Sequence, residues 1–228
     1  LKWSGLFHRR KRTPGRFMMR LKVPNGIVTS EHMRFFADSV GRYPAEVGVI
    51  DITTRQNIQL RGLELQDATD IIDGLQSRGL SNVQSGMDNV RNLVGSPIAG
   101  LDPHEQIDTR QICKDIDNMI TNNGIGNPAM TNLPRKFNIA VSGSRDDFAH
   151  TSINDIGLRP CPNKETGEMG FNVIVGGYFS IKRVMESIPM DLWLKPDDVV
   201  PFCQTMLEVF RDNGARGDRQ KARLIWLI

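Results

Sequence analysis

The sequence has no acidic residue in its first 30 positions, few aromatic residues and no long apolar run. No stretch approaches the roughly 18 consecutive apolar residues that a membrane-spanning helix needs, so we expect no membrane span. The stretch HRRKR and a sequence pI near 8.9 are typical of RNA-binding modules. However, aromatic residues make up only 7% and no RNP-like stacking pattern occurs, so we expect no nucleic-acid partner.

Cysteine and histidine are also scarce. Cys113, Cys161 and Cys203 lie far apart with no CxxC spacing, which excludes a disulfide framework or a cysteine metal site built from these residues alone. We expect free thiols in a reducing compartment. The four histidines are equally scattered, so the sequence predicts no metal site in this chain.

Basic residues are concentrated near the two ends, although the net charge is only +3. The first cluster comprises Lys2, Arg9, Arg10, Lys11, Arg12, Arg16, Arg20 and Lys22. The second comprises Arg211, Arg216, Arg219, Lys221 and Arg223. Such clusters indicate an acidic partner, and three kinds fit: a nucleic acid, a polycarboxylate ligand or an acidic protein.

Hydrophobic periodicity in the first third predicts a helix-backed antiparallel sheet. A turn signal, PNG, follows the first expected strand, and Thr29 or Ser30 caps the helix after it. The expected strands cover 16–23, 47–54 and 57–62, and the expected helices cover 29–43 and 65–79. This β-α-β-β-α order predicts a ferredoxin-like half domain over residues 1–80.

From residue 81 the sequence becomes rich in Gly, Asn and Pro, which predicts an ordered loop too long for a simple connector. Helices are then expected near 108–122 and 198–211, and strands at 135–142 and 170–176. We therefore predict an α+β protein in which the half domain is followed by a second, α/β domain over residues 81–228.

Four segments carry basic and amide side chains that a purely structural segment would not need. They are GRFMMRLK (15–22), TTRQNIQLRG (53–62), SGMDNVRN (85–92) and NLPRKFN (132–138). In the second segment the polar residues Arg55, Asn57, Gln59 and Arg61 alternate with apolar ones, which is costly if they are buried without anionic partners. Each arginine alone is better explained by solvation or a salt bridge than by a ligand. Together the segments favour a polyanionic ligand.

The segment 132–138 places two polar side chains close together within one expected strand. Residues two apart in a strand project to the same face. Lys136 and Asn138 are therefore expected to project together, opposite Phe137, into one polar site.

These segments, with GLFHRRKRTPGRFMMRLKVPNG, AGLDPHE and RGDRQKARLIWLI, resemble the assimilatory ferredoxin–nitrite reductases of cyanobacteria and chloroplasts. Those enzymes belong to the sirohaem nitrite and sulfite reductase family. The resemblance covers essentially the whole chain, in order. It implies six-electron reduction of nitrite to ammonium by reduced ferredoxin, at a sirohaem bridged through a cysteine thiolate to a [4Fe-4S] cluster. The eight carboxylates of sirohaem would be the partners of the basic segments.

The resemblance also implies roles for individual residues. Arg20, Arg91, Lys136 and Asn138 match the substrate side of the sirohaem iron, where sulfite reductases tend to have a second lysine in place of Asn138. Arg55 and Gln59 match positions that bind sirohaem carboxylates. Weaker candidates for the macrocycle are Thr53, Arg61, Asn89, Arg135 and the backbone of Gly176 and Gly177. The run Arg9 to Arg12 and the cluster around Arg219 are candidates for docking ferredoxin, with a solvated surface as the alternative.

Some features of the family are missing from this sequence. The four cluster-binding cysteines expected in the family's C-terminal half have no match among the three present, and both ends of the sequence look cut. We therefore expect an incomplete sirohaem-binding domain, a fragment inactive by itself, of an enzyme that is monomeric when complete. The implied location is a cyanobacterial cytoplasm or a plastid stroma. The alternative within the family is an assimilatory sulfite reductase.

Overall fold

The computed structural model describes residues 1–228 except residues 10, 12 and 182. Its strands are β1 (Leu6–His8), β2 (Phe17–Arg20), β3 (Ile50–Ile52), β4 (Ile58–Leu63), β5 (Ile139–Val141), β6 (Ile156–Pro162), β7 (Met169–Val175), β8 (Tyr178–Phe179), β9 (Val184–Met185) and β10 (Ile188–Leu194). Its α-helices are α1 (Ser30–Gly41), α2 (Ala68–Gln76), α3 (Arg110–Thr121) and α4 (Val199–Asn213). The predicted α+β class is confirmed.

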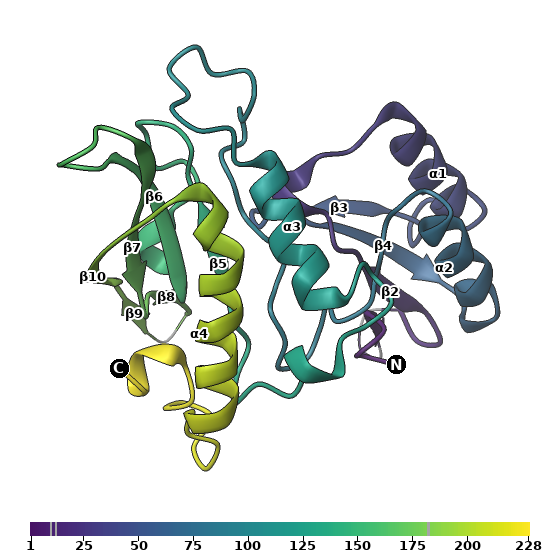
Figure 1. The fold of residues 1–228 in the computed structure, drawn as a ribbon. Coiled ribbons are helices and arrows are strands. Elements are labelled where there is room, and N and C mark those ends of the chain that lie inside the picture. Colours follow the sequence, from purple (N-terminus) through teal and green to yellow (C-terminus); the bar gives the residue numbers. More distant parts are fainter. Residues whose placement is uncertain (10, 12, 182) are drawn as a thin grey trace.

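The first sheet is antiparallel, with strand order β1-β2-β4-β3, and α1 and α2 lie together beside it (Figure 1). Thr29 caps α1 as predicted, because its hydroxyl accepts a hydrogen bond from the His32 backbone N–H. Met19 and Leu60, from the apolar faces of β2 and β4, pack with Phe36 of α1 in one buried cluster. The predicted ferredoxin-like half domain is confirmed, with β1 as an additional edge strand.

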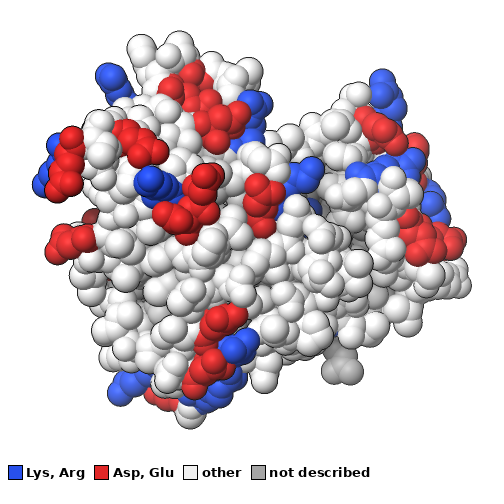
Figure 2. All heavy atoms as spheres, viewed as in Figure 1, with Lys and Arg blue, Asp and Glu red and all other residues white. Residues whose placement is uncertain are grey.

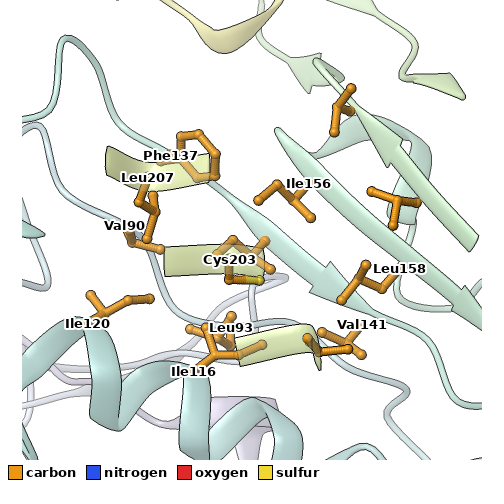
Figure 3. Close-up of a cluster of buried hydrophobic side chains, with 14 of the residues drawn as sticks. Val90, Leu93, Ile116, Ile120, Phe137, Val141, Ile156, Leu158, Cys203 and Leu207 are labelled. Carbon is orange, nitrogen blue, oxygen red and sulfur yellow. The ribbon is translucent and has the colours of Figure 1, made fainter. Parts of the chain in front are cut away.

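The second sheet has strand order β10-β7-β6-β5, and only the β5–β6 pair is parallel in the part of the chain that the structure describes. Helix α4 covers this sheet, and α3 packs against α4 between the two sheets (Figure 1). Figure 3 shows the core that results, in which Ile116 of α3, Cys203 of α4 and Ile156 of β6 are all fully buried. This core positions α3 beside both halves of the molecule.

The predicted long loop after residue 81 is ordered and tied to the second sheet. Val90 forms an isolated parallel bridge with Phe137, and Val94 forms another with Ala140. Val90 and Leu93 are fully buried in the second core (Figure 3). The loop therefore runs alongside the chain that leads into β5, which brings two of the polar sequence segments together.

Two expectations about strands need correction. The strand expected at 135–142 is confined to Ile139–Val141, because the chain at 135–138 follows Pro134 and pairs with the loop only through the Phe137 bridge. Strands β6 and β10 were not expected. Both contain proline, and β6 also contains Gly157, which obscures the sequence signal of a strand.

No helix in the described ranges is long and apolar enough to cross a membrane. Cys113 and Cys203 are buried free thiols and Cys161 is partly buried, as expected. Figure 2 shows that Lys, Arg, Asp and Glu lie mainly around the rim of the face drawn there, whose central part is largely uncharged. That face offers no broad basic patch.

Candidate functional site

A cavity of ≈ 350 Å³ lies where the first sheet meets the loop after residue 81 and the chain leading into β5. Its lining residues are Arg20, Thr53, Arg55, Asn57, Gln59, Ser85, Arg91, Asn92 and Lys136. Four of these side chains are cationic, and none of the described lining residues is acidic. The cavity is therefore a preformed site for an anion.

Arg20 and Arg91 lie side by side in this cavity. Arg20 ends β2, where it pairs with Gln59 of β4, and its guanidinium stacks over the Phe7 ring at 4.7 Å. Both arginines donate to the backbone carbonyl oxygen of Ser85, at 3.5 Å from Arg20 and 3.4 Å from Arg91. Arg91 also donates to the Met87 carbonyl oxygen at 2.9 Å. Backbone acceptors thus hold two cations together without neutralising either.

Arg55 is carried by the turn between β3 and β4. Gln56 has a positive φ of 54° in this turn, and Asn57 N–H donates to the Thr53 hydroxyl at 3.2 Å. Asn92 fastens the turn to the loop that carries Arg91, because its side-chain amide donates to the carbonyl oxygens of Arg55 at 3.0 Å and Gln56 at 3.1 Å. This contact fixes the separation of the two arginine-bearing segments.

The cations of the cavity repel one another. Burial, together with charge repulsion from Arg223, Arg91, Arg55 and Arg135, lowers the pKa of Lys136 to about 8. Burial, followed by repulsion from Arg20 and Arg55, lowers the pKa of Arg91 to about 10. The same causes shift the pKa of Arg20 and Arg55 downward. An anion bound here relieves this repulsion, so the electrostatics favour binding.

Asn57 Oδ1 and Arg91 Nε, which belong to residues of the cavity lining, have no hydrogen-bond partner among the described residues. Asn89 Oδ1 and Asn138 Oδ1, outside that lining, have none either. A buried polar atom without a partner costs free energy, about 1 to 3 kcal/mol. Polar groups left free around a cationic cavity suit a ligand that supplies both donors and acceptors.

The structure places some of the sequence-predicted residues elsewhere. Arg61 lies on the same strand as Gln59 but forms an ion pair with Asp51. Arg135 contacts Asp88 at 3.5 Å, and the Asn89 side chain is buried and donates to the Gly86 carbonyl oxygen at 2.6 Å. None of the three lines the cavity, whereas Arg20, Thr53, Arg55, Gln59, Arg91 and Lys136 do.

Asn138 is buried behind the cavity and is not part of its lining. The alternation expected for residues 136 and 138 requires strand geometry, but the strand begins only at Ile139. Phe137 between them is fully buried in the second core. Gly176 and Gly177 are also outside the cavity lining; a side chain on Gly176 would meet Ile225.

The late basic cluster has internal partners that the sequence did not reveal. Arg219 forms two hydrogen bonds to the Asp88 carboxylate, at 2.9 and 3.0 Å. Arg223 is 5% exposed and forms a two-point ion pair with Asp155, which is fully buried. The expectation that Arg223 belongs to a surface cluster is therefore wrong. Arg10 and Arg12 of the early cluster lie outside the described residues.

The described residues do not fit an iron–sulfur cluster by themselves. No group of three or more His, Cys, Asp or Glu side chains is placed to hold a metal ion in the described ranges. Cys113 and Cys203 lie inside the core of the second half, and burial raises the pKa of both thiols to about 12. Such thiols remain protonated, whereas cluster ligands are thiolates.

Two family models match the chain. The nitrite/sulfite reductase ferredoxin-like half domain matches residues 9–78, and the nitrite and sulphite reductase 4Fe-4S domain matches residues 86–228. The two matched regions thus define the two-part architecture of a nitrite and sulphite reductase. The chain belongs to the nitrite and sulphite reductase family.

The chain is similar along its whole length to named relatives. It is 54% identical to the chloroplastic ferredoxin–nitrite reductase of Zea mays and 51% identical to the ferredoxin–nitrite reductase of Leptolyngbya laminosa. It spans 40% and 44% of those proteins' lengths. Among solved structures, the Mycobacterium tuberculosis NirA protein matches 99% of this chain with a TM-score of 0.86 and 27% identity, over 42% of its own length.

Proposed function

We propose that the complete protein reduces nitrite to ammonium at a sirohaem coupled to a [4Fe-4S] cluster, with reduced ferredoxin as the electron donor. The observation that carries this proposal is the cavity lined by Arg20, Arg55, Arg91 and Lys136 without a described acidic neighbour. The relatives named ferredoxin–nitrite reductase at 51–55% identity support nitrite as the substrate.

The cavity fits the chemistry of sirohaem on two counts. Its cations suit the carboxylates of that macrocycle, since guanidinium groups bind carboxylates through paired charged hydrogen bonds. The partnerless Arg91 Nε–H provides a further donor for such a carboxylate. Arg55, Gln59 and Thr53 would hold the carboxylates. Arg61, Asn89 and Arg135, predicted as weaker contacts, would act from outside the described cavity lining. When bound, sirohaem supplies the iron at which nitrite receives electrons.

The chain's own residues would bind the substrate and manage its charge. Arg20, Arg91 and Lys136 attract the nitrite anion and stabilise negative charge as electrons arrive. Lys136 is suited to give up a proton, because its pKa is lowered to about 8 by burial and neighbouring cations. Asn138 would donate a neutral hydrogen bond from its side-chain NH2 group to the bound anion, although it is buried and lies outside the described cavity lining.

The remaining parts of the proposal concern the complete protein. The cysteine ligands of the cluster would be other residues of the complete protein, not Cys113 and Cys203, because these two belong to the core of the second half. The early basic run, of which Arg9 and Lys11 are described, would attract acidic ferredoxin. The complete enzyme would act as a monomer in a cyanobacterial cytoplasm or a plastid stroma, and light scattering of the purified protein tests the monomer.

The test is turnover by the complete protein with reduced methyl viologen as electron donor and either nitrite or sulfite as substrate. Nitrite reduction at a higher kcat/KM than sulfite supports the proposal. The reverse preference identifies a sulfite reductase, the alternative that the family name leaves open. A protein without a sirohaem Soret band rejects both and favours the RNA-binding alternative.

A further inference from the structure

Asp155 is buried beneath the cavity and is held by two different segments of the chain. Arg223 donates from Nε to Oδ1 at 3.0 Å and from Nη2 to Oδ2 at 2.6 Å, and its guanidinium stacks on the Tyr178 ring at 4.9 Å. The backbone N–H of Asn138 donates to Asp155 Oδ2 at 2.7 Å. Burial raises the pKa of the Asp155 carboxyl, whereas the Arg223 guanidinium and the backbone N–H groups of Asn138 and Leu224 favour its ionised form.

The Asn138 contact connects this ion pair to Lys136. Phe137, between the two residues, is fixed on the other side by the Arg91 loop: Arg91 N–H donates to the Phe137 carbonyl oxygen at 2.8 Å, and Phe137 N–H donates to the Asn89 carbonyl oxygen at 3.2 Å. The chain from Lys136 to Asn138 is therefore anchored at Asp155 on one side and at the Arg91 loop on the other. The ion pair helps to determine where the Lys136 ammonium lies.

The pair also controls the charge that Lys136 faces. Arg20 and Arg91 line the same cavity as Lys136, and Arg55 joins them from the β3–β4 turn. Two further cations act on Lys136 from outside the lining: Arg135, in the same segment, and Arg223, in the C-terminal segment. Arg223 is the strongest of the charge influences on its pKa. Because Asp155 partly neutralises Arg223, each member of the pair acts on Lys136 with an opposite sign.

We propose that the buried Asp155–Arg223 ion pair is a positioning unit for Lys136, which sets both the location of its ammonium group and the net charge around it. Its consequence for nitrite binding rests on the proposed function. Neither residue lines the cavity, so the pair acts through Lys136 rather than by touching the substrate.

The test compares Arg223→Gln and Asp155→Asn in the full-length protein. The pKa of Lys136 is measured by amine labelling across pH, read out on the Lys136 peptide by mass spectrometry. Removing the Arg223 cation should raise this pKa by about one unit, and removing the Asp155 anion, which leaves Arg223 unneutralised, should lower it. The alkaline midpoint of nitrite binding, titrated on the Soret band, should move up in Arg223→Gln and down in Asp155→Asn. Arg223→Lys keeps the charge but not the two-point contact, so its Lys136 pKa should stay closer to the wild type than that of Arg223→Gln.

A matched control is the Lys22–Asp117 ion pair. It is also buried, with Lys22 Nζ at 3.0 Å from Asp117 Oδ1, but it borders a different cavity. Asp117→Asn should leave the Lys136 pKa unchanged. Shifts of the same sign in both Arg223→Gln and Asp155→Asn, or no shift in either, would overturn the proposal. If opposite shifts occur but wild-type protein shows no nitrite-dependent spectral change, the pair is confirmed and only the proposed function fails.

Discussion

Arg20 and Arg91 share one hydrogen-bond acceptor, the backbone carbonyl oxygen of Ser85. Two guanidinium groups on a single neutral acceptor remain two uncompensated charges, and burial together with mutual repulsion lowers the pKa of Arg91 to about 10. Keeping these two unneutralised cations adjacent costs folding free energy. Such an arrangement is typical of a binding site rather than of a structural ion pair.

Replacing Arg91 with Gln in the complete enzyme should weaken nitrite binding by at least about tenfold, because a charged hydrogen bond contributes about 1.5 to 3 kcal/mol. A nitrite titration of the Soret band gives the Kd. Arg159→Gln is a suitable control, since Arg159 pairs with Asp147 away from the cavity. Equal affinities in the two variants would remove Arg91 from the substrate site.

Nitrite affinity should decline as the pH rises through the pKa of Lys136. This pKa is lowered to about 8, so the ammonium is present below that value and lost above it. Binding of nitrite favours the charged form and so raises the pKa of Lys136 in the complex. The Kd for nitrite measured from pH 6.5 to 10 should therefore rise mainly above pH 8. Lys136→Met should bind more weakly and lose most of this dependence; an unchanged pH profile in that variant would assign the titration to another group.

Exchanging Asn138 for Lys should shift preference toward sulfite, since a further cation suits a dianionic substrate. The ratio of sulfite to nitrite kcat/KM, measured with reduced methyl viologen, should increase by about tenfold, equivalent to about 1.4 kcal/mol. Asn138→Ala serves as a control that removes the amide without adding charge. If both variants give the same ratio as the wild type, Asn138 does not determine specificity.

Asn92→Ala should destabilise the protein by about 1 to 3 kcal/mol. Asn92 accepts from Val23 N–H at 2.7 Å and donates to the carbonyl oxygens of Val23 at 2.7 Å and Arg55 at 3.0 Å, so its loss leaves buried backbone groups without partners. Urea denaturation of the complete protein measures the change. Asn118→Ala, at a partly buried position of α3 that borders the other cavity, should have a smaller effect. A loss below 0.5 kcal/mol for Asn92→Ala would mean that other contacts hold the turn.

The parts of the fold that could be predicted from the sequence are those determined by residues close together in the chain. The helix that begins after Thr29 and the stripe of Val199, Cys203 and Phe210 in α4 follow from capping and from a 3.6-residue period. Strand β6 was missed because Pro160 and Pro162 obscure it, although it pairs with both β5 and β7. Such pairing depends on distant segments, which a local pattern does not report.

The candidate site, like the fold, was predicted only in part. Arg20, Arg55, Arg91 and Lys136 were predicted from polar segments and a family resemblance, and the structure brings them to one cavity; their roles in binding and catalysis stay predictions. Arg223 was placed in a surface cluster because its partner Asp155 is 68 residues away in the sequence. Only the folded chain shows that an arginine in a basic run is buried.

The central claim, that this cationic cavity holds a polycarboxylate macrocycle, is tested most directly by the sirohaem content of two matched variants of the complete protein. Arg55 lines the cavity, whereas Arg159 pairs with Asp147 outside it. The Soret absorbance per mole of purified protein should fall at least about threefold in Arg55→Gln and stay near the wild-type value in Arg159→Gln. Equal sirohaem content in both variants and the wild type would contradict the account.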